Sequence, residues 1–250
     1  MASFARKELG EILRTWRIWV LPGIVIFFAL TGPLLAKFTP QLVGAVAGSR
    51  LGGLKVPTPT YTDSYIQWTK NLTQIVLIAV IIVYGSLVSG EVRSGTAVLV
   101  LTKPLSRRAF VLVKAVVQSV FLAVVVAVGA LITWLLTLAI FGAAPAGALW
   151  SATGVFLVQG LLFVALMTLL SSVIGSAAGS AGAGLAGFAV LAIAAIWKPL
   201  QDYSPAALSS LPGELAAAKP ASVGWPVVTS LALALVLTGL AGQLFRRRDL

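Results

Sequence analysis

The sequence predicts an all-α integral membrane protein with six transmembrane helices. Of its 250 residues, 59% are hydrophobic and only 10% are charged, whereas soluble domains carry about a quarter charged residues. Six apolar segments approach the roughly 20 residues that a helix needs to cross the hydrocarbon layer. No second domain is indicated, so we expect one transmembrane domain over residues 1–250.

The six spans follow from hydropathy and from the residues that interrupt helices. They are expected at residues 18–36, 72–89, 110–141, 148–174, 181–197 and 223–245. The third and fourth are long enough to tilt or to extend beyond the bilayer. Residues 141–150 predict a Gly/Pro hairpin turn, and the small residues 175–182 predict a second tight turn. A longer polar connection is expected over residues 37–70.

Residues 4–17 precede the first span and predict an amphipathic helix at the membrane surface. Its apolar face carries Ala5, Leu9, Ile12, Leu13 and the interface anchor Trp16. Its polar face carries Lys7, Glu11, Arg14 and Arg17, which either face water or also contact a cytoplasmic partner. This charged start does not resemble a cleavable signal peptide, so we expect it in the mature protein.

The placement of Lys and Arg predicts the orientation. With the amino terminus inside, twelve of the eighteen basic residues fall in cytoplasmic pieces and six outside, as the positive-inside rule requires. An even number of spans returns the carboxyl terminus to the same side. The net charge of +11 therefore indicates membrane orientation rather than nucleic-acid binding.

The connection between the second and third spans has the most informative pattern. Its charged, turn-forming and capping residues are Glu91, Arg93, Gly95, Thr96, Pro104, Ser106 and Arg107. Gly95 permits a sharp change of direction, and Pro104 ends a short apolar piece at residues 97–101. Ser106 is placed to cap the next helix. The pattern predicts either a short coupling helix that transmits a push from a soluble partner, or an ordinary basic loop.

This connection resembles the corresponding loop of the permease subunits of ABC-2-type exporters. The shared order, G-E-x-x-x-G-T and then L-x-L-x-x-P-x-S-R, is carried here by Gly90, Glu91, Gly95, Thr96, Leu99, Leu101, Pro104, Ser106 and Arg107. Residues 4–37 are similar to that family's connecting helix and first span. The resemblance implies that residues 90–96 belong to a coupling region that docks on an ATP-binding subunit. It also implies a second permease copy, as a homodimer or heterodimer, in a bacterial inner membrane.

Missing residue types exclude most enzyme chemistry. The chain has no Cys and no His, which removes thiolates, histidine bases and the usual zinc ligands, and we expect neither catalytic nor metal-binding residues. It has no GxxxxGK[ST] phosphate loop, so ATP and Mg²⁺ are expected in a partner subunit. No charged residue lies in the middle of a span, which disfavours an ion-coupled transporter or an intramembrane enzyme. A non-transporting membrane scaffold or assembly subunit stays open.

Three weaker features leave alternatives. Gln118 and Gln159 are the candidates for a substrate path, although such residues also pack helices. The small residues 175–187 suit either packing of the fourth span on the fifth or a dimer face. Residues 205–211 and 213–219 predict short helices interrupted at Pro212, or else a polar outer loop.

Overall fold

The computed structural model describes residues 2–47, 58–96 and 106–247, which form helices and no strand. In chain order the elements are α1 (Ala2–Arg14), α2 (Arg17–Ala47), α3 (Tyr61–Asn71), η2 (Leu72–Val76), α4 (Leu77–Tyr84), α5 (Ser89–Arg93), α7 (Arg107–Phe141), α8 (Ala146–Val173), α9 (Ala177–Ala194), α10 (Lys198–Tyr203), η3 (Pro205–Ser209), α11 (Leu211–Ala216) and α12 (Gly224–Arg246). Within the described residues, six helical segments are long and apolar enough to cross a membrane. The predicted fold class is confirmed.

The second span is longer than expected. It begins at Tyr61 rather than at residue 72, because Asp63 accepts a hydrogen bond from the Thr60 N–H at 2.8 Å and starts α3. Its first turns are polar, but Ser64, Trp68 and Thr69 are buried against other parts of the bundle. Ser64 lies 2.7 Å from the Thr137 hydroxyl of α7. α2 reaches Ala47, so in the connection expected over residues 37–70 the described residues 37–47 and 61–70 are helical.

The later spans lie close to their expected positions, with one shifted turn. α7 ends at Phe141 and is capped by Gly142, whose φ of 72° is left-handed and whose N–H donates to the Leu138 carbonyl at 2.9 Å. The fifth span starts at Ala177, earlier than expected, because the Ser176 hydroxyl accepts the Gly179 N–H at 3.0 Å and caps α9. The small residues predicted as a turn therefore lie mostly inside a helix.

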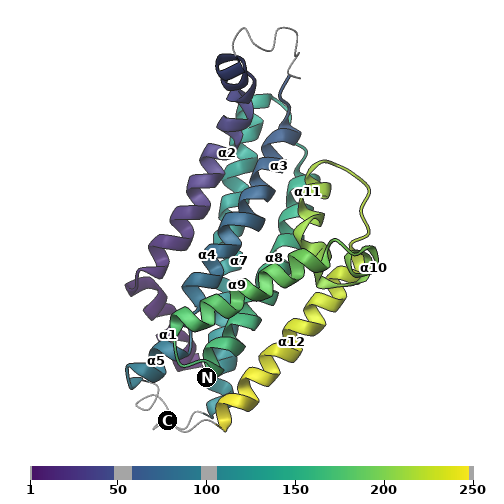
Figure 1. The fold of residues 1–250 in the computed structure, drawn as a ribbon. Helices are drawn as coiled ribbons and strands as arrows, with labels where there is room; N and C mark the ends of the chain where they lie inside the picture. The colour runs from purple at the N-terminus through teal and green to yellow at the C-terminus, as the bar shows by residue number, and fades with distance from the viewer. Residues whose placement is uncertain (1, 48–57, 97–105, 248–250) are drawn as a thin grey trace.

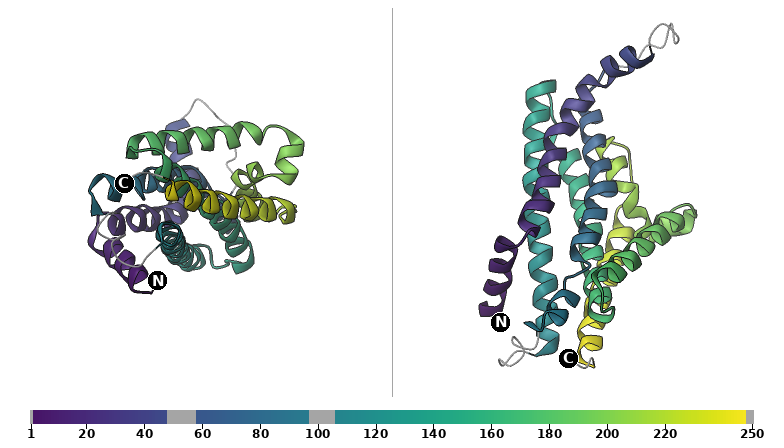
Figure 2. Two further views of the ribbon diagram at one scale, coloured as in Figure 1. Left: turned by 90° about the horizontal axis from the view of Figure 1, so that it is seen from below. Right: turned by 60° about the vertical axis from the view of Figure 1, so that its left-hand side comes forward.

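Four long segments, α2, α3–α4, α7 and α8, stand side by side, and α12 packs on α7 and α8 (Figure 1). The first turn of α7 and the last turn of α12 lie at the same end of this bundle as α1 and α5. α9 is inclined to the others and stands at one side (Figure 2). Packing at the centre is close: a Cβ on Gly129 of α7 would lie 2.5 Å from Val25 and 2.6 Å from Trp68.

The small residues of the fifth span pack inside this chain. A Cβ on Gly184 of α9 would lie 2.4 Å from Met167 of α8 and 2.9 Å from Ile81 of α4. The absence of a side chain therefore lets three helices meet. The opposite side of α9 exposes Val190 and Ile193. A dimer face on that side stays a prediction.

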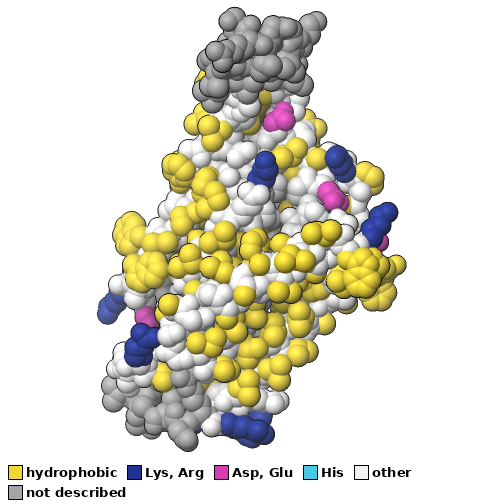
Figure 3. Space-filling view, viewed as in Figure 1, with side chains coloured by type: hydrophobic (Ala, Val, Ile, Leu, Met, Phe, Trp, Pro, Cys, Tyr) yellow, Lys and Arg dark blue, Asp and Glu magenta, His cyan; other side chains and the backbone are white. Residues whose placement is uncertain are grey.

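The exposed surface fits a lipid environment. Hydrophobic side chains cover the middle of the face formed by α9 and α12, while charged side chains gather toward the two ends (Figure 3). α10, η3 and α11 follow α9, and η3 and α11 pack on α8. The two short helices expected here are η3 and α11, but the break between them lies at Ser210, and Pro212 is the second residue of α11.

Candidate coupling site

The second span breaks shortly before the connection that was singled out in the sequence. α4 ends at Tyr84, and α5 begins at Ser89 after a turn. The Ser171 hydroxyl of α8 accepts the N–H groups of Val88 and Ser89 at 2.9 and 3.0 Å. These two donors at the start of α5 would otherwise be buried without a partner. The break is therefore held in place by the neighbouring helix.

The turn packs closely against the start of α9. A Cβ on Gly85 would lie 2.7 Å from the carbonyl oxygen of Ala177. Only glycine fits this approach without a shift of backbone. On the other side of α5, the Arg93 guanidinium donates to the carbonyl of Gly175 at 3.0 Å. The α4–α5 segment thus contacts both the α8–α9 turn, at Gly175, and the start of α9, at Ala177.

The Glu91 side chain points inward from α5 and is 7% exposed. Lys114, in the second turn of α7, is fully buried and donates to Glu91 Oε1. The same ammonium donates to both carboxylate oxygens of Glu8 on α1, at 3.0 and 2.9 Å. One buried cation therefore joins α1, α5 and α7. Removing one partner from such a buried group costs about 3–5 kcal/mol.

Lys7 closes this cluster at its rim. Its Nζ lies 3.3 Å from Glu91 Oε1, 2.9 Å from Glu11 Oε2 and 3.5 Å from Glu8 Oε1. Three carboxylates thus face two ammonium groups; we name these five residues, Lys7, Glu8, Glu11, Glu91 and Lys114, the ion cluster. Burial raises the pKa of the Glu8 carboxyl, against the opposing effect of Lys114. Burial lowers the pKa of Lys7, but the hydrogen bond to Glu11 and the nearby carboxylates outweigh it and raise that pKa overall.

A group of three aromatic rings packs against the ion cluster at Lys114. The Phe110 ring of α7 lies 5.4 Å from Phe4 of α1 and 5.5 Å from Phe245 of α12, centroid to centroid. Lys114 Nζ lies 5.2 Å from the centre of the Phe110 ring. These contacts place the end of α12 next to the ion cluster. Four elements from distant parts of the chain therefore meet within one layer at one end of the bundle.

Metal binding does not suit this cluster. The ligand oxygens of Glu8, Glu11 and Glu91 lie within 4.8 Å of one another, a spacing compatible with a cation. Two ammonium groups already occupy the positions between them. The arrangement is that of an ion-pair network that connects α1, α5 and α7.

A sequence profile of the ABC-2 family transporter proteins matches residues 2–250. The chain belongs to the ABC-2 family. It is also similar to the probable ABC transporter permease protein NosY of Pseudomonas aeruginosa, with 33% identity over 188 residues. That match covers 73% of this chain and 63% of the relative, so it spans less than two thirds of the relative's length.

Most of the residues that carried the ABC-2 resemblance lie in two described segments, one ending at Thr96 and one beginning at Ser106. Gly90, Glu91, Arg93, Gly95 and Thr96 lie on α5 and in the turn after it. The turn uses the left-handed backbone of Gly95, with a φ of 74°. The predicted coupling helix at residues 97–101 lies outside the described residues, as does Pro104.

The chain is described again from residue 106, where α7 starts. Ser106 caps this helix by accepting the Ala109 N–H at 3.2 Å. Arg107 donates to the Arg246 carbonyl at 3.4 Å and so contacts the end of α12. Glu91 contacts the amino-terminal helix α1 through Lys7, and Arg93 donates to the α8–α9 turn.

The predicted surface helix is α1, which ends at Arg14 rather than at residue 17. Phe4, Glu8 and Ile12 are buried and form its contact face, whereas Trp16 is exposed in the turn before α2. Lys7 and Glu11 lie in the ion cluster, Arg14 is exposed, and the Arg17 side chain is outside what the structure describes.

Glu8 and Lys114 were not among the predicted site residues of this ABC-2 chain. A signal for each was present in the sequence. Lys114 stands seven residues after Arg107, within an apolar run that begins the third span, and an ionisable group there is expected to have a partner. Glu8 shares the i, i+4 face of Phe4 and Ile12. Glu8 and Lys114 are 106 positions apart in the sequence, so their pairing can be identified only from the folded structure.

Proposed function

We propose that this chain is the transmembrane permease subunit of an ATP-driven ABC exporter. Membership of the ABC-2 family and similarity to a probable ABC transporter permease support this proposal. ATP and Mg²⁺ would be bound by a separate ATP-binding subunit, because this chain lacks a phosphate loop. Two permease copies would form the substrate pathway. The chain would reside in a bacterial inner membrane with both ends in the cytoplasm.

The ion cluster is the observation that carries the coupling role. It joins α1, α5 and α7 immediately before and after the segment that resembles the docking loop of ABC-2 permeases. Charge-assisted hydrogen bonds in a water-poor interior resist separation more than surface ion pairs do. A displacement of the docking loop would therefore move α1 and the start of α7 together. That movement reaches the membrane because α7 is one continuous helix from Arg107 to Phe141.

Gln118 and Gln159 are the proposed substrate-path residues. They lie on α7 and α8 and are buried at 1% and 3% exposure. Within the described residues, both amide atoms of Gln118 and the Oε1 of Gln159 lack a hydrogen-bond partner. Buried amides without partners are costly. If the helices part during transport, these groups become available to a polar part of the substrate or to water.

Co-purification from the native host tests the proposal. Tagged permease is extracted in a gentle detergent, and associated proteins are identified by mass spectrometry. We expect an ATP-binding cassette subunit with the parent chain and with the control Arg6→Gln, which changes an exposed charge on α1. A chain that recovers no such subunit would support the scaffold alternative instead.

Glu91→Ala separates docking from coupling. Glu91 is buried in the ion cluster, so we expect this variant to retain the ATP-binding subunit but to lose the permease-dependent change in ATP hydrolysis in proteoliposomes. Adding Arg93→Ala changes an exposed side chain and tests whether it also contributes to docking. ATP hydrolysis by Glu91→Ala that responds to the permease as the parent does would refute the coupling role.

A further inference from the structure

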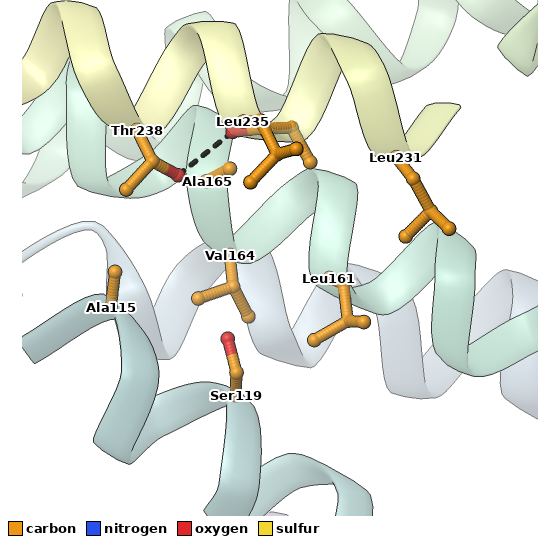
Figure 4. A pocket seen from close by; sticks show the side chains of 9 residues that line it. Ala115, Ser119, Leu161, Val164, Ala165, Leu231, Leu235 and Thr238 are labelled. Carbon is orange, nitrogen blue, oxygen red and sulfur yellow. Dashed lines mark hydrogen bonds between the residues drawn. The ribbon is translucent and has the colours of Figure 1, made fainter. Parts of the chain in front are cut away.

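An apolar groove of about 310 Å³ opens between α7, α8 and α12. Figure 4 shows α7 and α12 as its walls, with side chains of α8 between them. Small side chains create the hollow: Ala115 and Ser119 on α7, Ala165 on α8 and Ala234 on α12. Leu235, at its edge, is 75% exposed, so the groove opens to the surface of the bundle.

The groove offers little to a polar ligand. Its Thr238 hydroxyl already donates to the Ala234 carbonyl at 2.8 Å (Figure 4). The other side chains that line it are apolar except Ser119. Its volume lies at the lower end of the roughly 300–1,000 Å³ that small-molecule sites occupy. These properties suit a narrow hydrocarbon chain.

Four arginines lie at one end of α7 and α12, the two helices that form the walls of the groove. Arg107 and Arg108 begin α7, while Arg246 and Arg247 end α12. The two helix ends touch, because Arg107 donates to the Arg246 carbonyl and a Cβ on Gly242 would lie 3.7 Å from the Arg108 side chain. Arg108, Arg246 and Arg247 are exposed.

The charges of Arg108, Arg246 and Arg247 are not neutralised by carboxylates among the described residues. Over the described ranges, the ion pairs all involve Lys7 or Lys114, and Arg108, Arg246 and Arg247 have no carboxylate partner. Arg107 and Arg108 also occupy the first turn of α7, where the helix dipole favours an anion and disfavours a cation. This end of the groove therefore attracts a negatively charged group.

The groove begins within one membrane leaflet of the arginines and extends beyond it. Ala115 lies seven residues after Arg108, or about 10 Å along α7. On α12, Thr238 and Leu231 lie eight and fifteen residues before Arg246, or about 12 and 22 Å. The groove thus runs through the hydrocarbon below the arginines, in a layer whose full thickness is about 30 Å.

We propose that this groove binds one acyl chain of an anionic phospholipid, whose phosphate is held by Arg108, Arg246 and Arg247. Exposed arginines bind phosphate oxygens well, and each basic group near an anionic headgroup strengthens binding. The combination selects a phospholipid with net negative charge over a zwitterionic one. The site lies on the outside of the bundle, on α7 and α12, and does not depend on the proposed transport function.

Native mass spectrometry of the purified full chain tests this site. The probes are dioleoyl phosphatidylglycerol and dioleoyl phosphatidylcholine, titrated separately into delipidated protein. We expect the phosphatidylglycerol to bind more tightly, and Arg108→Gln with Arg247→Gln to weaken it about 25-fold, from about fivefold for each arginine. Ala234→Leu fills the groove and should also weaken binding. Ala186→Leu, the same change on the exposed side of α9, should not.

Other results would overturn the proposal. Equal affinity for the two lipids, or unchanged phosphatidylglycerol binding in the double arginine variant, would refute the headgroup site. Unchanged binding in Ala234→Leu would refute the acyl-chain groove. If Ala234→Leu instead lowers the fraction of dimer, a second copy covers the groove and the lipid proposal fails. Size-exclusion profiles of all variants identify any that are misfolded, and for these the conservative Arg108→Lys replaces Arg108→Gln, with partial retention of binding expected.

Discussion

Lys114→Met tests how much the ion cluster contributes to the free energy of unfolding. Methionine keeps most of the length of the side chain but removes the buried cation. Glu8 and Glu91, 1% and 7% exposed, then lose their inner partner. The expected cost is about 3–5 kcal/mol, the range for breaking a buried ion pair. Since about 1 kcal/mol lowers the melting temperature of a chain of this size by roughly 2–4 °C, we expect a decrease of roughly 6–20 °C.

Lys7→Met is the matched control, because it removes a cation from the same cluster at the rim. The Lys7 side chain is 41% exposed, so solvent screens its pairs. Its loss should cost about 0–1 kcal/mol. Thermal unfolding of both variants in the same detergent, followed by tryptophan fluorescence, gives the comparison.

Neutralising all three buried members of the ion cluster shows whether Lys114→Met destabilises the protein by leaving unpaired charges or by changing the packing. The triple variant Lys114→Met, Glu8→Gln, Glu91→Gln leaves no buried ion behind. Replacing a complete buried group costs much less than breaking it, so the triple variant should melt well above Lys114→Met. If Lys114→Met is no less stable than Lys7→Met, or if the triple variant is as unstable as Lys114→Met, the reasoning is refuted.

Two further predictions concern acidity and close packing. The Glu8 carboxyl has a pKa raised above its ordinary 4.5; its stabilising contribution is therefore complete below that value and is lost as the pH rises through the raised pKa. When the pH is lowered from 8 to 5, the melting temperature of the parent should therefore rise more than that of Glu8→Gln. Equal changes in the two proteins would contradict the raised pKa of Glu8. Gly129→Ala places a methyl group 2.5 Å from Val25 and should cost about 1–3 kcal/mol, measured by thermal unfolding, whereas Gly154→Ala, with open space at its Cβ, should not.

The six spans could be predicted because their windows are apolar and their boundaries carry Gly, Pro or capping residues. Ser106, for example, caps α7 as its position indicates. The start of the second span could not be located in this way. Its polar residues find partners on helices far along the chain, such as Trp68 with the Thr153 hydroxyl at 3.2 Å. Hydropathy cannot distinguish polar residues that face water from those that face another helix.

The candidate site was visible only in part. Glu91, Lys7 and Glu11 could be named from charge and position, but the partners that hold Glu91 could not. From the sequence alone, a carboxylate at the end of a span can be either a docking group or one partner of an internal ion pair. The choice depends on whether Lys114 of α7 faces α5, which is set by how the helices pack. The order of residues in the loop indicated the family, while the geometry shows how its two flanks are joined.

A double electron–electron resonance measurement tests the central claim, that the ion cluster makes α1 and α7 move together. The chain has no cysteine, so two introduced cysteines can be labelled selectively. Arg6→Cys on α1 and Leu112→Cys on α7 are both exposed. The permease is measured with its ATP-binding subunit, without nucleotide and after trapping with ATP and vanadate, in the parent and in Lys114→Met. We predict one distance, unchanged by nucleotide, in the parent and a nucleotide-dependent shift or broadening in Lys114→Met. Identical distance distributions in the two proteins would contradict the claim.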